Sequence, residues 1–278
     1  MKKLLVIALA TVLCAAFAIP ASAIENEFGG YWRTRMYTTD NYDGLDSGSQ
    51  SVVDTRTRLY YTAKFSDDLK FVNKFEFNQV WGNSTGGDIG TDGKGIFRIK
   101  HSYADFNAAN MNFTIGMQAA VFGRGLLFDD DFAGAIATYK MGDNSFSATW
   151  MKVGEENTGV EFPKLYESED APTAAKTGTE RDFYALSANL NLSDTMSVAP
   201  YFLFDKAEGP EATEAFYLGA DLDMKIGEAS AWGTLIYAGG KKNVADFDDD
   251  LTANAVDMSA YLIALGADAG VVHGQIFY

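Results

Sequence analysis

Apolar and polar residues alternate along short runs of this chain, and this period of two is typical of β-strands whose two faces differ. Residues 55–65 illustrate the pattern. One face carries Arg56, Arg58, Thr62 and Lys64, and the other carries Leu59, Tyr61, Ala63 and Phe65. In a soluble protein one strand face commonly meets water, so the alternation alone leaves open whether the apolar face meets a protein core or lipid.

The same reading extends over the whole chain and indicates an all-β protein without a convincing helical period. Thirteen strands are predicted, at residues 27–38, 52–65, 70–81, 96–107, 111–118, 134–141, 146–153, 182–192, 196–204, 214–226, 229–238, 258–268 and 271–278.

The connections between these strands alternate strictly between long and short. The long ones are predicted at 39–51, 82–95, 119–133, 154–181, 205–213 and 239–257, and the short ones at 66–69, 108–110, 142–145, 193–195, 227–228 and 269–270. Transmembrane β-barrels sort their connections in this way, with tight periplasmic turns and long external loops. A soluble sandwich with Greek-key crossings has no reason to do so. The pattern therefore predicts an antiparallel transmembrane β-barrel with its apolar face toward lipid.

Each of the four tryptophans falls in a predicted strand, several near its ends: Trp32, Trp81, Trp150 and Trp232. Aromatic girdles at the two membrane interfaces would place them there. Ordinary strand aromatics explain them about as well.

Residues 1–23 have the features of a secretory signal peptide: Lys2 and Lys3, an apolar run from Leu4 to Ile19, and the small-residue site Ala21-Ser22-Ala23. The run is shorter than the roughly 20 apolar residues that span a bilayer. We therefore expect cleavage before Ile24 and a single barrel domain over residues 24–278.

The net negative charge of the chain restricts the kinds of molecule that it is expected to bind. Without Lys2 and Lys3, the 22 basic residues become 20, against 38 acidic ones. Nucleic acid is therefore not an expected partner, because phosphate contacts need a basic surface. The only cysteine, Cys14, lies in the predicted signal peptide, so no disulfide or cysteine-bound zinc is expected after cleavage.

Basic residues gather on the polar faces of the first four predicted strands. They are Arg33, Arg35, Arg56, Arg58, Lys74, Arg98 and Lys100, and include five of the seven arginines of the chain. Neighbouring strands lie about 4.8 Å apart, so these side chains are expected to form a compact basic wall. Inside a narrow passage such a wall would focus the electric field on passing ions. The alternative is a solvated face that only keeps the interior wet.

The third long connection and its flanks read AAVFGRGLLFDDDFAGA, residues 119–135. An external loop would rarely carry the apolar side chains Val121, Phe122, Leu126, Leu127, Phe128 and Phe132. We expect this segment to fold back into the barrel, pack these side chains against the wall, and direct Asp129, Asp130 and Asp131 across the opening.

Taken together, the signal peptide, the alternating strands, the early arginines and the acidic third loop resemble the Gram-negative general porins. No stretch is a strict motif, and Met117 stands in TIGMQ where such porins often have an arginine. The resemblance implies a homotrimer of 16-stranded barrels in the outer membrane, in contact with lipid and lipopolysaccharide. It also implies passive diffusion of small hydrophilic solutes without a cofactor, and a constriction formed by the third loop.

Thirteen strands is an odd number, and with the first strand rising from the periplasm the last one would end at the outer rim. This favours a chain that is incomplete at its C-terminus. The alternative takes Val272, Gly274, Ile276 and Tyr278 as the aromatic signal at the end of a complete barrel.

An enzyme and a non-conducting structural barrel or adhesin are the other classes of function. His101 and the adjacent Ser102 point to opposite strand faces and cannot form a catalytic pair. His273 has no serine near it in the sequence, and the acidic clusters lack the order of a calcium loop. An adhesin is expected to have a plugged lumen, whereas the predicted wall of arginines indicates an open one.

Overall fold

The computed structural model describes residues 24–40, 48–82, 96–154, 180–208, 212–245, 253–270 and 272–278. They form thirteen antiparallel strands in sequence order. The predicted signal peptide and most of the predicted long loops lie outside these residues. The described part of the chain has one helical element, a three-residue turn, and none of it is a helix that could span a bilayer. The chain divides into two compact units, Met1–Phe106 and Asn107–Tyr278.

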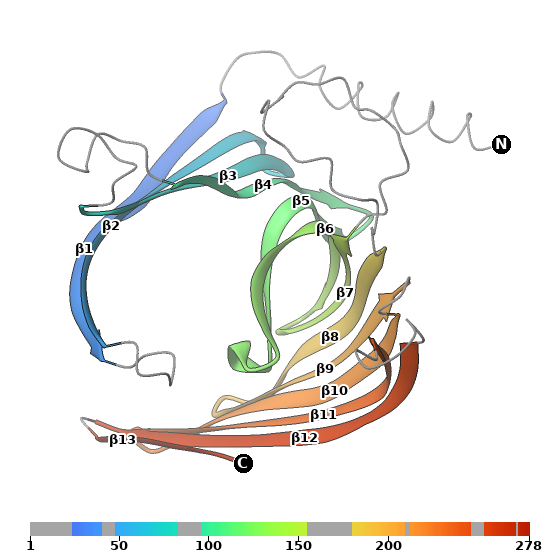
Figure 1. Cartoon of the computed structure of the whole chain (residues 1–278). Coiled ribbons are helices and arrows are strands. Elements are labelled where there is room, and N and C mark those ends of the chain that lie inside the picture. Colours follow the sequence, from blue (N-terminus) through green and yellow to red (C-terminus); the bar gives the residue numbers. More distant parts are fainter. Residues whose placement is uncertain are drawn as a thin grey trace. The chain divides into compact units, whose positions relative to one another are not determined.

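The first unit is an antiparallel meander (Figure 1). Its strands are β1 (Glu25–Asp40), β2 (Ser49–Ser66), β3 (Leu69–Val80) and β4 (Ile96–Ala108). Strands β1 and β2 pair without interruption from Glu25 opposite Lys64 to Asp40 opposite Ser49. This long register aligns the polar positions of both strands on one face, because directly opposed residues in a sheet share a side.

The second unit contains the remaining strands. They are β5 (Met111–Phe122), β6 (Phe128–Met141), β7 (Asn144–Gly154), β8 (Arg181–Ser193), β9 (Met196–Ala207), β10 (Thr213–Ile226), β11 (Ala229–Ala245), β12 (Ala253–Ala269) and β13 (Val272–Phe277). Between β5 and β6 lies the helical turn η1 (Gly123–Gly125).

The sequence prediction of thirteen strands is confirmed, and so are its six tight turns. Ala109 and Asn110, for example, both have positive φ (50° and 62°) between β4 and β5. A two-residue turn with positive φ at both positions matches the twist of the strands that it joins.

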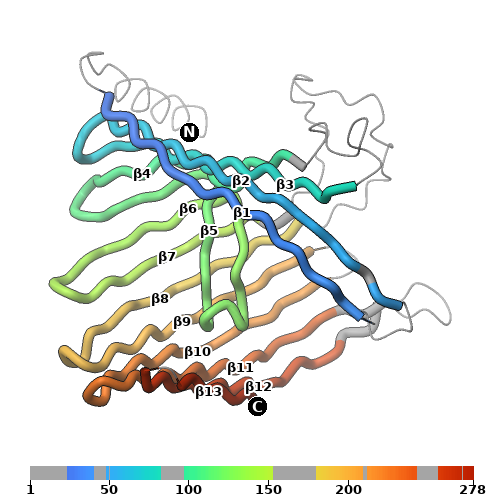
Figure 2. The backbone as a smooth tube through the Cα atoms, turned by 90° about the vertical axis from the view of Figure 1, so that its left-hand side faces the viewer, coloured from blue at the N-terminus to red at the C-terminus, as the bar shows by residue number. Residues whose placement is uncertain are grey.

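The prediction of a long loop at residues 119–133 is wrong. Strand β5 continues to Phe122 and β6 begins at Phe128, so the connection is a five-residue tip on a long hairpin. Every residue from Met111 to Phe122 has an opposite partner in β6. In the second unit this β5–β6 hairpin leaves the curved sheet and lies on its concave side (Figure 1). A view turned by 90° shows it crossing over the neighbouring strands (Figure 2).

In each unit one face of the sheet is apolar and exposed. In the first unit this face carries Phe28, Trp32, Met36, Leu59, Phe77 and Phe97. In the second it carries Tyr184, Leu186, Phe202, Leu218, Leu235, Tyr237, Tyr261 and Ile263. Leu186 is 62% exposed, whereas its sequence neighbour Ala185, on the other face of β8, is buried. The period-two alternation thus separates an outward apolar face from a second face of different character in both units.

Candidate functional site

The arginines of the predicted basic wall share one face of the first unit. Arg33 lies directly opposite Arg56, Arg35 opposite Asp54, and Arg58 opposite Glu76. Arg98 of β4 lies opposite Glu76 on its other side. We call Arg33, Arg35, Arg56, Arg58 and Arg98 the arginine ladder.

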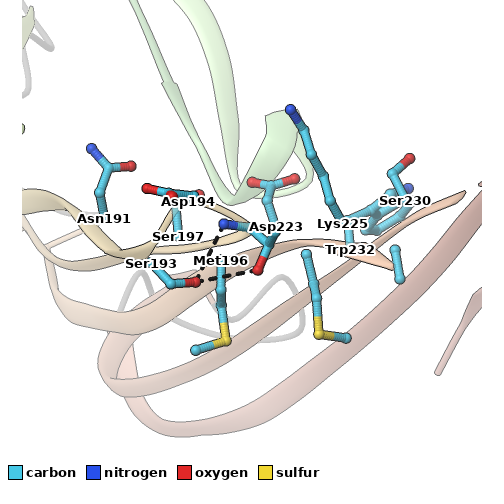
Figure 3. Close-up of a pocket in the computed structure, with 12 residues that line it drawn as sticks. Asn191, Ser193, Asp194, Met196, Ser197, Asp223, Lys225, Ser230 and Trp232 are labelled. Carbon is cyan, nitrogen blue, oxygen red and sulfur yellow. Dashed lines mark hydrogen bonds between the residues drawn. The ribbon is translucent and has the colours of Figure 1, made fainter. Parts of the chain in front are cut away.

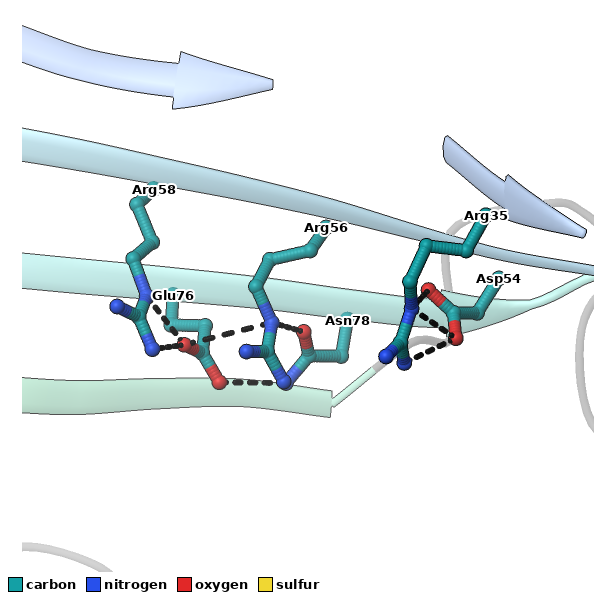
Figure 4. A network of polar contacts seen from close by, with 6 residues as sticks. All are labelled: Arg35, Asp54, Arg56, Arg58, Glu76 and Asn78. Atoms are coloured by element: carbon teal, nitrogen blue, oxygen red, sulfur yellow. Dashed lines mark hydrogen bonds and ion pairs between the residues drawn. The ribbon is translucent and has the colours of Figure 1, made fainter. Parts of the chain in front are cut away.

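Two carboxylates and an amide bind part of this ladder (Figure 4). Arg35 contacts both oxygens of Asp54, with its Nη2 2.5 Å from Oδ2 and its Nε 3.2 Å from Oδ1. Arg58 donates from Nε to Glu76 Oε2 at 2.5 Å. Arg56 donates to Asn78 Oδ1 at 2.6 Å, and its Nε lies 3.5 Å from Glu76 Oε2. Arg35, Arg56 and Arg58 of the predicted basic wall are therefore paired with side chains of the same face.

Three of the five guanidinium groups contact the carboxylates of Asp54 and Glu76, so the arginine ladder keeps more positive charges than these two carboxylates neutralise. Arg33 Nε is buried and has no hydrogen-bond partner among the described residues. Its opposite neighbour Arg56 carries the same charge, an arrangement that destabilises a sheet unless an anion or water compensates it. Glu76 is 3% exposed and is held between Arg58 and Arg56.

The two predicted lysines of the wall are placed differently. Lys74 lies over the ring of Tyr60, with Nζ 5.1 Å from the ring centroid. Lys100 is the additional residue of an irregularity in the β3–β4 pairing, where His101 lies opposite Lys74 and Ile99 opposite Phe75. The bulge changes the alternation, so that odd-numbered residues of β4 after Lys100 lie opposite even-numbered residues of β3. A prediction that assumes a strict period of two cannot locate such a bulge.

In the second unit the β5–β6 hairpin packs on the strands β8 to β11. Phe122 and Phe132 of the hairpin are buried in a cluster with Met151, Ala185, Tyr201, Leu203 and Ile236. Leu127 and Phe128 pack against the same cluster. The prediction that apolar residues of this segment pack on the wall is correct for these four residues. It is wrong for Val121 and Leu126, which are 57% and 39% exposed.

Polar contacts of Arg124 hold the tip of the hairpin against β10. Arg124 donates from Nη2 to the carbonyl of Leu222 at 3.2 Å and lies 2.7 Å from Asp223 Oδ1. Its guanidinium also lies over the ring of Trp232, 5.1 Å from the centroid. Trp232 therefore faces the hairpin and does not belong to an outward aromatic girdle, in contrast to the exposed Trp32 and Trp150.

Gly123 allows the close approach of the tip. Its φ is +61°, and a Cβ atom there would lie 2.7 Å from the Tyr201 hydroxyl and 2.9 Å from Ile236 Cδ1. Glycine has no Cβ and adopts positive φ without strain. A larger residue at position 123 would push the hairpin tip away from Tyr201 and Ile236.

Asp129, Asp130 and Asp131 lie within strand β6 and not in a loop. They are opposite Val121, Ala120 and Ala119 of β5. Because side chains alternate along a strand, Asp129 and Asp131 share the hairpin face of the exposed Val121, and Asp130 shares the face of Phe122 and Phe128. Two of the three predicted acidic residues thus point away from the wall on which the hairpin packs.

A small cavity of about 280 Å³ lies beside the hairpin tip, between the β8–β9 and β10–β11 turns. It is lined by polar groups that include Ser193, Ser197, Asp223 and Lys225. Figure 3 shows Asp223 and Lys225 pointing toward the hairpin tip and Met196 pointing away from it. Among the described residues no cluster of histidine, cysteine, aspartate or glutamate could hold a metal ion.

The sequence contains a signal for the place where the β5–β6 hairpin packs, and the strand predictions did not use it. Residues 199–204 read APYFLF, so β9 is apolar on both faces at this point. Phe202 faces outward and is partly exposed, whereas Tyr201 and Leu203 are buried under the hairpin. A barrel strand with an apolar residue at each position indicates that something packs on its inner face.

Comparison with known proteins gives the class of the fold. No family model matches the chain, and no curated protein matches it in sequence. Similar solved structures include OccD3 of Pseudomonas aeruginosa (TM-score 0.51, 12% identity, covering 90% of this chain and 56% of OccD3). OccK2 of the same organism has TM-score 0.51 and 11% identity, covering 91% of this chain and 62% of its own. OccAB1 of Acinetobacter baumannii has TM-score 0.50 and 13% identity, covering 88% of this chain and 61% of its own.

OccD3 and OccK2 are outer-membrane porins. At these identities the similarity concerns the fold alone, and the chain spans about three fifths of the length of each of the three proteins. The fold of this chain is thus that of an outer-membrane porin: an all-β, antiparallel transmembrane barrel type, with thirteen strands in the described residues. Its outward apolar face is the one expected to contact lipid.

Proposed function

We propose that this protein is an outer-membrane channel through which small hydrophilic solutes and ions diffuse passively. The observation that carries the proposal is the arginine ladder, a charged network on the sheet face opposite to the exposed apolar face. Arginines on a lipid-facing surface would cost about 2–4 kcal/mol each at the bilayer midplane, so a water-filled interior is the physically favourable environment for them.

The hairpin supports the proposal from the second unit. One face of the hairpin is apolar and packs on β8–β11. Asp129 and Asp131 lie on the opposite face of the hairpin. We propose that solutes pass on the carboxylate side. The expectation that Asp129, Asp130 and Asp131 lie across the opening from the basic wall stays a prediction.

Small polar solutes are the proposed substrates, and no cofactor is required for diffusion. The structure of OccK2 has also been solved in complex with glucuronate, and that form has TM-score 0.51 and 11% identity to this chain. A small, charged, hydrophilic solute therefore binds to a protein of this fold. A homotrimer and contact with lipopolysaccharide remain expectations from the resemblance to general porins.

Single-channel recording tests the proposal. The full-length protein, purified in detergent and added to a planar lipid bilayer in KCl, should give discrete conductance steps. A structural barrel or adhesin gives no steps, and a barrel enzyme gives turnover without them. Bilayers that stay silent when the same preparation shows intact β-structure by circular dichroism would contradict the channel proposal.

The topology is tested on intact cells. We propose that the tight turns, such as Ser66–Leu69, face the periplasm and that the long connections face outside. External protease should then cut within the connections around residues 41–47, 83–95 or 155–179, which lie outside the described residues. Cleavage confined to the tight turns would reverse this orientation.

A further inference from the structure

The outward face of the second unit carries a row of side chains with alternating charge. Each member lies directly opposite the next one across five successive strand pairings, and all six lie near the strand ends that lead to the long connections. Directly opposed residues share a sheet face, and opposite charges in such positions attract one another. From β7 to β12 this charged row consists of Lys152, Asp182, Lys206, Glu214, Lys241 and Asp257.

An aromatic row lies two residues further along the strands on the same face. Trp150, Tyr184, Phe204 and Phe216 are opposite one another in turn, and Trp150 and Tyr184 are exposed. Trp150 donates from Nε1 to Asp182 Oδ1 at 2.9 Å, which joins the two rows. Tryptophan and tyrosine concentrate where the hydrocarbon of a membrane meets its headgroups. The charged row therefore lies at the level of the lipid headgroups.

An apolar groove of about 580 Å³ begins at the aromatic row. Trp150, Tyr184 and Phe204 line it together with Ala148 and two further alanines of β6, and its remaining lining residues are apolar except Thr149. The small alanine side chains leave space between the larger aromatic ones. Ligand pockets in proteins have volumes of about 300–1,000 Å³, so this groove is large enough for part of one lipid acyl chain.

The charges above the groove favour one kind of headgroup. Lys152 Nζ lies 3.1 Å from Glu180 Oε1 and 3.4 Å from Asp182 Oδ2, and Lys206 Nζ lies 2.7 Å from Glu208 Oε1. Two ammonium groups thus lie among three carboxylates. This surplus of negative charge repels a purely anionic headgroup, whereas a headgroup that carries both charges finds a partner for each of them.

We propose that the groove and the charged row bind one membrane lipid with a phosphoethanolamine headgroup. Its acyl chain lies in the groove, its phosphate contacts Lys206 and its ammonium group contacts Asp182. These two residues are directly opposed on neighbouring strands, about 4.8 Å apart, and the two-carbon linker between the phosphate and the amine spans a similar distance. The inference concerns the lipid side of the protein and does not depend on whether the protein conducts ions.

Native mass spectrometry tests the headgroup. The purified protein in detergent is mixed with equal amounts of dioleoyl phosphatidylethanolamine, phosphatidylglycerol and phosphatidylcholine, and the protein with one bound lipid is quantified. Phosphatidylethanolamine should be retained about tenfold more than either competitor, as expected for one charge-assisted hydrogen bond. Phosphatidylglycerol lacks the ammonium group, and the methylated ammonium of phosphatidylcholine has no N–H to donate. Equal retention of the three lipids, or a preference for phosphatidylglycerol, would overturn the assignment.

Two matched pairs of variants locate the site. Lys206→Gln should weaken the retention of phosphatidylethanolamine about tenfold. Lys241→Gln removes the same charge from the same row on β11, two strands away from Lys206, and should leave retention unchanged. Ala148→Leu fills the groove and should also weaken retention. Ala220→Leu adds the same atoms to the outward face of β10, outside the groove, and should not.

The alternative role of the charged row is to hold the strand ends together through cross-strand ion pairs. In that case Lys206→Gln lowers the free energy of unfolding in detergent but leaves the preference among the three lipids as it is in the wild type. This outcome, or equal effects of Lys206→Gln and Lys241→Gln on retention, would overturn the proposal. Conductance is not needed for any of these measurements, so the lipid site and the channel are tested separately.

Discussion

The sheet face opposite the exposed apolar face has a different character in each of the two units. In the first unit this face is a polar network in which arginines, Asp54, Glu76 and Asn78 contact one another across three strands. In the second unit the corresponding face of β8–β11 is covered by the hairpin and contains buried Tyr201, Leu203 and Ile236. Both units present the same kind of exposed apolar face on the other side.

The difference shows that strand alternation specifies which face is outward but not what the other face does. A polar second face holds its shape through ion pairs and remains hydrated. An apolar second face needs a covering element, because exposed apolar surface in water is unfavourable by roughly 25 cal/mol per Å². The hairpin provides this cover. We therefore expect substitutions on this face to affect stability in the unit that contains the hairpin, and both stability and ion selectivity in the unit that contains the polar network.

The largest effect is expected for Leu203→Ala. Leu203 is 2% exposed beneath the hairpin, and truncation of such a residue costs about 2–5 kcal/mol because a cavity remains. Leu218→Ala on the outward face of β10 removes the same atoms, but lipid or detergent fills the space, so only the transfer contribution is lost. Urea unfolding in detergent micelles, followed by tryptophan fluorescence, measures both variants. Equal losses would indicate that the hairpin is not packed on β9.

A somewhat smaller effect is expected for Gly123→Val at the hairpin tip. The new side chain meets the Tyr201 hydroxyl and Ile236, and such overpacking typically costs about 1–3 kcal/mol. Gly142→Val is the matched control, because Gly142 has nearly the same φ (+59°) and a Cβ atom there would have nothing within 4 Å. Only Gly123→Val should make the hairpin susceptible to limited proteolysis. Similar proteolysis of both variants would show that backbone strain, and not the contact with the wall, determines the result.

Glu76→Gln tests the polar network of the first unit. It removes the carboxylate shared by Arg56 and Arg58 while keeping the shape of the side chain, and we expect a loss of about 1–3 kcal/mol in unfolding free energy. It should also make the channel more anion-selective, because one negative charge beside the arginine ladder is lost. Reversal potentials in a KCl gradient give the second result. A shift toward cations would contradict the placement of this network in the conducting path.

Two double variants are expected to change ion selectivity in opposite directions. Arg56→Ala with Arg58→Ala should raise the cation-to-anion permeability ratio, and Asp129→Asn with Asp130→Asn should lower it. Both shifts should weaken at high salt, since the Debye length falls from about 10 Å at 0.1 M to about 3 Å at 1 M. Reversal potentials at the two salt concentrations test this. Unchanged values for both double variants would refute a constriction that involves these residues.

Much of the fold can be predicted from the sequence because period-two alternation and turn residues are local signals. The predicted strand 182–192, for example, agrees with β8 to within one residue at each end. The hairpin cannot be predicted in the same way, since residues 119–122 and 128–133 lack a clean alternation and their packing depends on strands far along the chain. The pairing of Arg35 with Asp54 and of Arg58 with Glu76 depends on register, which only the structure supplies. The bulge at Lys100 likewise depends on how β3 and β4 pair.

The docking of the hairpin also has a consequence for the order of folding. Each strand pairing of the second unit joins strands that are consecutive in the sequence, so the sheet can grow by local steps. The contact from Arg124 to Leu222 instead joins residues 98 positions apart. Closing such a loop costs entropy before any contact compensates for it, so contacts of this kind form late. Until then Tyr201, Leu203 and Ile236 are exposed to water, and an intermediate with this patch is prone to aggregation. We therefore expect strands β8–β11 to form first and the hairpin to close onto them afterwards.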